Sequence, residues 1–296
     1  MPTQPITPSE RHPDLAKAIG LADIYLKRED LHPYGSHKGR SIPVMIDHYR
    51  NKGDRNFAIS SSGNAALAAA LHIKKLNENA SASDKITIDI FVGNNISPNK
   101  LAKLQSLTDE QIRVLVKERP LQALSSAISE GKRSLRQSTD DIALLGYESL
   151  AEELSEIDEL GSVFIGTSSG TTAEALARYF TTHKSNVQIH IVQTSSCHHL
   201  SEVFEAYGGP DERSIADAIV DQTAIRKDVL VPMIHKTGGY GWCATNEEII
   251  TAQTLVKKHA DLDISTNSAL SIVGAMQAIY RTWDFKGKVV CIIAGQ

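Results

Sequence analysis

Lys38 is the residue of this sequence whose setting best suits covalent chemistry. It follows a Pro-Tyr-Gly turn and precedes a helix that we predict to begin near Arg40. A positive helix end and a nearby guanidinium both favour the neutral amine, the form that makes a Schiff base with a carbonyl compound. The ordinary alternative is a solvated surface lysine, which is the commoner role of any single lysine. Other residues must therefore support the reactive interpretation.

The first supporting loop is rich in small polar residues and stands before a predicted alanine-rich helix. Ser61, Ser62 and Gly63 allow close approach to the backbone, so that several N–H groups can face an anion such as a carboxylate. Asn64 ends the loop, and its alternative role is simply to cap the helix that follows. This loop is a candidate carboxylate site.

A second loop of similar character precedes another predicted helix. It consists of Gly166, Thr167, Ser168, Ser169 and Gly170. Backbone amides, hydroxyl groups and a helix dipole together are typical of a phosphate-binding loop. The loop lacks the Gly-Lys-Ser/Thr ending of a P-loop and the spacing of a Rossmann fingerprint, which disfavours nucleotide binding.

These loops fall between strands and helices that alternate along the chain, as in parallel sheets covered by helices on both faces. The apolar patterns predict strands at residues 24–26, 56–60, 86–92, 112–116, 142–145, 163–165, 187–192 and 289–294, with an extended piece at 229–231. They predict helices at residues 40–52, 65–76, 98–107, 121–135, 149–158, 171–180, 200–206, 246–259 and 268–283.

Composition excludes several classes of partner. The 296 residues carry a formal charge of −4 with no basic patch for nucleic acid, and no apolar run is long enough for a membrane helix. Three unpaired cysteines suit a reducing compartment, so we expect a cytoplasmic protein. Cys197, His198 and His199 are adjacent without a well-spaced further ligand, so we expect no metal site.

The order of these features resembles the fold-type II pyridoxal-phosphate enzymes over essentially the whole chain. That family includes threonine synthase, the threonine and serine dehydratases, cysteine synthase and the tryptophan synthase β chain. Lys-Arg-Glu-Asp-Leu at residues 27–31 and Gly-Ser-His-Lys at 35–38 look most like tryptophan synthase β. The Ser-Ser-Gly-Asn-Ala run at 61–65 and residues 146–153 are more similar to threonine synthase and the dehydratases.

The resemblance implies an α/β fold of two interleaved lobes, each a mostly parallel twisted sheet covered by helices, as in tryptophan synthase β. Residues 1–42 and 147–296 would form a large cofactor-binding domain, and residues 43–146 a small mobile domain. It also implies pyridoxal 5'-phosphate as the cofactor, an amino acid as the substrate and a homodimer as the assembly.

Site residues carry over position by position from the same resemblance. Lys38 would form the Schiff base with the cofactor and move protons at the substrate Cα, and His37 would add a phosphate contact. Asn64 would bond the cofactor's 3-hydroxyl group. The substrate carboxylate would be held by Ser61, Ser62, Gly63 and Asn64. The cofactor phosphate would be held by Gly166, Thr167, Ser168, Ser169 and Gly170.

The expected activity is elimination or replacement on a small amino acid, as in threonine synthase or the dehydratases. Ala294 departs from the family, because a Ser or Thr that bonds the pyridine nitrogen is expected there. Ser168 and Ser169 stand where glycines are usual. One alternative is therefore a catalytically impaired homologue that binds cofactor or amino acid, or a subunit activated by a partner. The other is β-replacement of the cysteine synthase kind.

Overall fold

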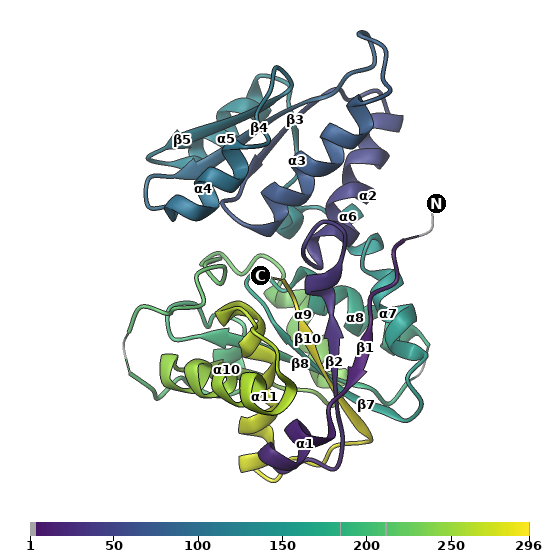
Figure 1. The fold of residues 1–296 in the computed structure, drawn as a ribbon, viewed down its shortest axis with the longest axis vertical. Helices are drawn as coiled ribbons and strands as arrows, with labels where there is room; N and C mark the ends of the chain where they lie inside the picture. Colours follow the sequence, from purple (N-terminus) through teal and green to yellow (C-terminus); the bar gives the residue numbers. More distant parts are fainter. Residues whose placement is uncertain (1–3, 184, 211, 296) are drawn as a thin grey trace. The chain divides into compact units, whose positions relative to one another are not determined.

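The computed structural model describes residues 4–183, 185–210 and 212–295 of the protein. The chain forms two compact units, and it leaves the larger one to build the smaller before returning (Figure 1). The larger unit is Met1–His32 with Tyr147–Gln296, and the smaller is Pro33–Gly146. The predicted α/β class with two interleaved lobes is confirmed.

The larger unit contains a six-stranded sheet in the order β1-β2-β10-β7-β8-β9. All neighbouring strands run parallel except β1, which is antiparallel to β2 at the edge. The strands are β1 (Ser9–Arg11), β2 (Ile24–Arg28), β7 (Leu160–Gly166), β8 (Gln188–Thr194), β9 (Gly241–Ala244) and β10 (Lys288–Ile293).

Helices cover both faces of this sheet, and each face has its own core. Phe164 of β7 lies in the core under one group of helices, while its neighbours Val163 and Ile165 lie in the opposite core, because successive strand residues point to opposite faces. The first group is α1 (Pro13–Ile19), α10 (Asn246–Ala260) and α11 (Thr266–Tyr280). The second is α7 (Glu148–Ser155), α8 (Thr171–Thr182) and α9 (Lys227–Lys236).

The smaller unit is built around a four-stranded parallel sheet in the order β5-β4-β3-β6. Its strands are β3 (Asn56–Ser60), β4 (Thr87–Gly93), β5 (Ile112–Lys117) and β6 (Arg133–Ser134). The helices are α2 (Lys38–Asn51), α3 (Asn64–Asn77), α4 (Pro98–Gln105), α5 (Pro120–Ser129) and α6 (Ile142–Leu145). Across both units, short 3₁₀ turns occur within the described residues at Glu29–Leu31, Gln137–Thr139 and Ser201–Val203.

Residues 33–42 belong to the smaller unit, whereas the sequence-based division placed them with the large domain. They contain the start of α2, and this helix buries Ile42, Met45 and Ile46 in the core of the smaller unit. The Ser41 hydroxyl also donates to the carbonyl of Ala143 at 2.7 Å. Because the start of α2 packs within the smaller unit, the boundary between the two units falls after His32 rather than after Ile42.

Two secondary-structure predictions in the smaller unit were wrong. Residues 142–145 form the short helix α6 rather than a strand, because Asp140 accepts the amide of Ile142 at 2.9 Å and starts a helical turn. The helix predicted for 121–135 ends at Ser129, since Gly131 adopts a left-handed φ of 93°. The strand of this region is β6.

Two predictions in the larger unit were also wrong. Residues 229–231 lie within α9, which contains Pro232 in its interior, rather than in an extended piece. The helix expected at 200–206 is only the 3₁₀ turn at Ser201–Val203. The sequence patterns also missed β1, α1 and β9, all short.

Two helix starts have well-defined cap positions. Thr245 caps α10 and forms a reciprocal capping box with Glu248. Gly63 takes the cap position of α3, so Asn64 is the first helical residue and does not serve as its cap.

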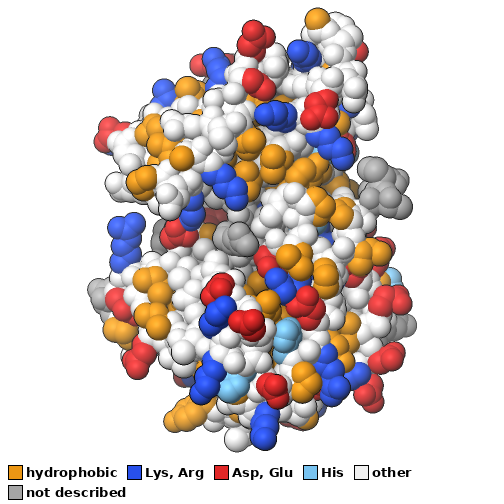
Figure 2. Space-filling model, in the orientation of Figure 1, with side chains coloured by type: hydrophobic (Ala, Val, Ile, Leu, Met, Phe, Trp, Pro, Cys, Tyr) orange, Lys and Arg blue, Asp and Glu red, His pale blue; other side chains and the backbone are white. Residues whose placement is uncertain are grey.

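Charged side chains of both signs are dispersed over the visible surface of each unit (Figure 2). No helix within the described residues is long and apolar enough to cross a membrane.

Candidate active site

The loop at residues 166–170 and the first two residues of α8 form a tight turn, which we call the cradle. Gly170 has a left-handed φ of 85°, and a Cβ on it would lie 2.4 Å from Leu230 Cδ2. Its amide donates to Thr167 Oγ1 at 3.0 Å. Gly166 is also confined, because a Cβ there would lie 2.9 Å from the carbonyl oxygen of Asn267. Both glycines are needed for close packing.

The cradle offers donors to an anion. The amides of Ser168, Ser169, Thr171 and Thr172 have no acceptor among the described residues. The hydroxyls of Ser169 and Thr171 bond each other at 2.9 Å. Since α8 is a 12-residue helix, its positive dipole end adds to these amides. The donor set fits the phosphate of pyridoxal phosphate.

A buried acidic residue in the first turn of α8 is neutralised by arginines. Glu174 is fully buried and lies 2.8 Å from Arg226 Nη1 and 2.6 Å from Arg178 Nη2. Arg226 is itself buried, so this pair is shielded from water. The acidic side chain therefore does not oppose an anion in the cradle.

Gln193 braces the cradle, and the sequence analysis did not identify it. Its Oε1 accepts the amides of Leu200 and Ser201 at 2.8 and 3.0 Å, and its Nε2 donates to the Ser168 carbonyl at 3.2 Å. The only signal in the sequence was a glutamine directly after the apolar run at 187–192; the structure shows it wholly buried.

Lys38 begins α2 in the smaller unit, and His37 precedes it at the cap position. The Lys38 amide donates to Ser36 Oγ at 3.3 Å, and Gly35 turns the chain with a φ of 75°. Tyr34 joins this turn to α3 through a 3.0 Å bond between its hydroxyl and His72 Nδ1. The turn thus places Lys38 at a helix start, as predicted.

The loop at residues 61–63 leads into α3 in the same unit. Ser61 continues the strand ladder by donating its amide to the Phe91 carbonyl at 3.2 Å, and its hydroxyl accepts the Gly63 amide at 3.3 Å. The amides of Ser62 and Asn64 have no acceptor among the described residues. The start of α3 therefore also presents amides that can bind a carboxylate.

The predicted site residues divide between the two units. Packing of α2 on α3 brings the Lys38 turn beside the start of α3, since a Cβ on Gly35 would lie 4.0 Å from Leu67 of α3. These two groups belong to the smaller unit and the cradle to the larger one.

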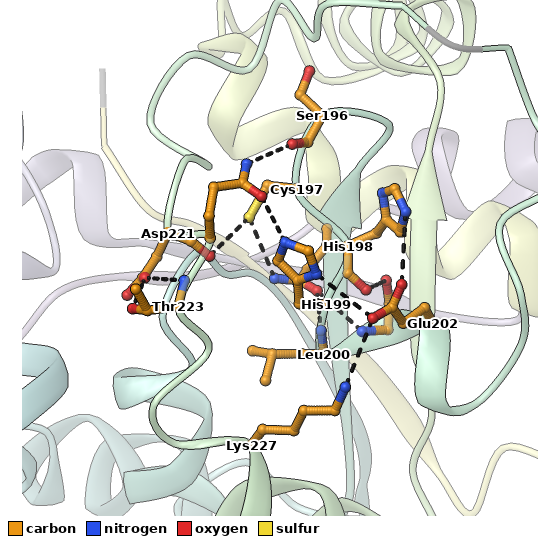
Figure 3. A network of polar contacts seen from close by, with 12 residues as sticks. Ser196, Cys197, His198, His199, Leu200, Glu202, Asp221, Thr223 and Lys227 are labelled. Atoms are coloured by element: carbon orange, nitrogen blue, oxygen red, sulfur yellow. Dashed lines mark hydrogen bonds and ion pairs between the residues drawn. The ribbon is translucent and has the colours of Figure 1, made fainter.

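The Cys197 thiol and the rings of His198 and His199 do not converge on one point (Figure 3). The Cys197 thiol faces the Asp221 carbonyl at 3.3 Å, and burial raises its pKa to about 11. Both histidines face Glu202, at 3.8 and 3.6 Å. No group of three His, Cys, Asp or Glu side chains in the described ranges is arranged to hold a metal ion.

The position that the family resemblance assigns to a pyridine-nitrogen ligand carries no hydroxyl. Ala294 directly follows β10. At the next residue, the hydroxyls of Ser265, which caps α11, and of Ser268 donate to the Gly295 carbonyl oxygen at 2.6 and 2.7 Å.

The two mostly parallel sheets carry candidate ligand-binding groups at the ends of their strands: the cradle in one unit and a lysine at a helix start in the other. This arrangement is typical of α/β proteins that bind small molecules. The chain belongs to the family of pyridoxal-phosphate dependent enzymes, whose family model matches residues 2–295. Pyridoxal phosphate is accordingly its cofactor, and the resemblance to fold-type II enzymes is confirmed.

Similar proteins agree with this assignment. Threonine synthase of Methanocaldococcus jannaschii is 23% identical over 98% of this chain and 74% of its own length. Threonine synthase of Mycobacterium leprae is 24% identical over 98% of this chain and 80% of its own.

Solved structures share the fold. A pyridoxal 5'-phosphate-dependent aspartate racemase has a TM-score of 0.82 at 20% identity, covering 98% of this chain and 90% of its own. Threonine deaminase isoform 2 from Solanum lycopersicum has a TM-score of 0.78 at 20% identity, covering 98% and 84%.

Proposed function

We propose that this protein catalyses an elimination or replacement on a small amino acid, in the manner of threonine synthases and threonine deaminases. The observation that carries the proposal is the set of unbonded amides in the cradle of a chain whose family match spans residues 2–295. Its relatives include two threonine synthases.

Each group of residues has one task in this proposal. The cradle amides hold the cofactor phosphate, with His37 as a further contact, and Asn64 bonds the cofactor's 3-hydroxyl. Amides of residues 61–64 hold the substrate carboxylate and so fix the orientation of Cα. Lys38 would hold the cofactor covalently, and once the substrate amino group replaces it there, its freed amine would take and return the Cα proton. When bound, pyridoxal phosphate withdraws electrons from the substrate Cα.

Three further features belong to the same proposal. The smaller unit acts as a mobile domain, the protein works as a homodimer, and it resides in the cytoplasm. Family resemblance supports the first two, and three unpaired cysteines support a reducing compartment. Light scattering after size exclusion tests the dimer.

A second candidate function follows from Ala294. Without a hydroxyl at that place, the protein would bind cofactor and amino acid yet turn over slowly, or would need a partner for activity. Rapid turnover by the isolated protein would exclude this candidate.

Absorbance spectra with added pyridoxal phosphate, followed by product assays, test the proposal. Serine, threonine, O-acetylserine and phosphohomoserine form the panel, with release of keto acid, acetate or phosphate as the readout. We expect Lys38→Ala to lower turnover by at least about 1,000-fold, since the amine is both anchor and proton carrier.

A matched control is Lys52→Ala, because Lys52 is an exposed lysine at the other end of α2. It should keep the wild-type spectrum and turnover. If Lys38→Ala retains the wild-type visible absorbance and activity, the assignment of Lys38 is wrong.

A further inference from the structure

Ser168 connects the cradle to an irregular segment, residues 214–224, which we call the strap. Its Oγ accepts the backbone amides of Val220 and Asp221, both at 2.9 Å. Two amides from the middle of the strap thus converge on one hydroxyl oxygen of the cradle.

The two bonds from the strap determine which hydrogen-bonding positions of the Ser168 hydroxyl remain available. A serine Oγ can accept two hydrogen bonds and donate one. Both acceptor positions of Ser168 are occupied by the strap, and its hydrogen has no acceptor among the described residues. The remaining hydrogen is free to donate to an anion held by the cradle amides.

Other contacts hold the strap from outside the cradle. Asn267 at the start of α11 accepts the Ala218 amide at 3.0 Å, and the Cys197 thiol faces the Asp221 carbonyl at 3.3 Å (Figure 3). Ala216 and Ile219 of the strap are buried in the core that also contains α10 and α11. The strap is therefore anchored to the sheet and to α11, while Ser168 adds a link that an anion in the cradle can strengthen.

We propose that Ser168 is a positioning residue that couples the cofactor phosphate to closure of the strap. Donation of its hydrogen to the phosphate polarises the hydroxyl and strengthens the two bonds from the strap amides. By thermodynamic linkage, phosphate binding closes the strap and strap closure tightens phosphate binding by the same factor. This inference rests on the proposed role of the cradle as the phosphate site.

Limited cleavage by an arginine-specific protease tests the coupling in the whole protein. Arg213 is exposed immediately before the strap, and such a protease is unaffected by cofactor attached to lysines. We expect pyridoxal phosphate or inorganic phosphate to slow cleavage after Arg213 by about fivefold or more, the usual lower bound for coupled sites. Pyridoxal, which lacks the phosphate, should protect about as little as buffer.

Variants separate the coupling from simple binding. Ser168→Ala should bind pyridoxal phosphate more weakly, by absorbance titration, and should lose protection even at saturating cofactor. Ser168→Thr keeps the hydroxyl and should restore both properties. Ser169→Ala is the matched control, because Ser169 bonds Thr171 and not the strap; it should remain protected at saturation.

The outcomes distinguish this inference from the proposed function. If the wild-type protein binds no cofactor, the proposed function fails and this inference with it. If the cofactor binds but protects no better than pyridoxal, or if Ser168→Ala is protected like the wild type, the coupling role alone is overturned. Comparing protection by pyridoxal phosphate and by pyridoxal on the wild-type protein tests the coupling even if a variant does not fold.

Discussion

The starts of α3 and α8 use the same local design and are supported very differently. Each follows a strand of a parallel sheet and leaves amides without an acceptor in the described part of the chain. At α8 a Cβ on Gly170 would meet Leu230 at 2.4 Å, and Gln193 and Ser168 brace the loop. At α3 a Cβ on Gly63 would meet nothing within 4 Å.

Under the proposed function, this contrast separates two kinds of anion site. A braced loop keeps its amides in place before the ligand arrives, so little order has to be gained on binding. Such a site suits the phosphate of a resident cofactor. An open loop lets its anion enter and leave, as a substrate carboxylate must in every turnover.

Gly170→Ala should have the largest effect of these substitutions, because it changes the closely packed loop before α8. An alanine at this left-handed φ costs about 1–2 kcal/mol, and its Cβ must also displace Leu230. Because the displaced loop carries the cradle amides, we expect the Kd for pyridoxal phosphate to rise at least about tenfold, equivalent to about 1.4 kcal/mol. Absorbance titration and urea unfolding measure the two effects.

Gly238→Ala is the control for backbone strain. Gly238 has a φ of 71° in the same unit, and a Cβ there would find its nearest atom at 3.9 Å. It should lose similar stability through the left-handed φ and keep its cofactor affinity. Equal losses of affinity in the two variants would mean that the cradle is not the phosphate site.

Regular elements and their loops could be predicted from the sequence because their patterns are local. The apolar run at 163–165 and the glycine-flanked loop after it predicted β7 and the start of α8. The Lys38 turn likewise opened a helix as expected. The alternation of strands and helices then predicted parallel sheets, because parallel neighbours need a crossover connection that is usually a helix.

The support of the cradle could not be predicted, because it comes from residues distant in sequence. Val220 and Asp221 lie some fifty positions from Ser168, within a stretch that has no periodic pattern. The extended piece expected at 229–231 belongs instead to α9, which contains Pro232 in its interior and buries Leu230 and Ile234 in the core. Gln193 depends in the same way on amides that fold back from residues 200–201.

The two units also differ in the titratable groups that they bury. In the larger unit, burial lowers the pKa of His190 to about 3, and its ring stacks on Phe164 at 4.3 Å. In the smaller unit, burial of Asp89 is outweighed by bonds from Arg113 and Lys132, which hold its pKa below the usual value of 3.8. Acid should therefore act on the two units in different pH ranges.

The larger unit should lose stability first as the pH falls. Below pH 6.5 an unfolded chain protonates His190 while the folded chain keeps it neutral, so the free energy of unfolding falls from there towards pH 3. The contribution of Asp89 is present above pH 3.8 and is lost only below it. Trp242 and Trp283, the two tryptophans of the sequence, both lie in the larger unit, so their fluorescence reports on it.

His190→Gln tests this assignment, since a glutamine oxygen can still accept the Trp242 Nε1 hydrogen that His190 Nδ1 accepts at 3.2 Å. From urea unfolding followed by tryptophan fluorescence at pH 7.5 and 5.5, we expect the variant to lose about 1.4 kcal/mol less than the wild type between the two. Identical losses would show that another group governs acid sensitivity.

Gly63→Ala should have the smallest effect on folding. It tests the start of α3, the loop that has open space around its glycine. Because φ at Gly63 is −126° and a Cβ would meet no neighbour, the free energy of unfolding should change by no more than about 0.5 kcal/mol. The added methyl group stands beside the amides of Ser62 and Asn64, where it would crowd a bound carboxylate.

We therefore expect Gly63→Ala to raise KM for the amino-acid substrate by about three- to tenfold, equivalent to about 0.7–1.4 kcal/mol, with cofactor affinity unchanged. Steady-state kinetics at saturating pyridoxal phosphate, together with absorbance titration, measure both quantities. Loss of cofactor affinity to the degree expected of Gly170→Ala would contradict a division between a braced phosphate site and an open carboxylate site. An unchanged KM would instead exclude the start of α3 from substrate binding, since its amides would then tolerate a methyl group at no cost to recognition.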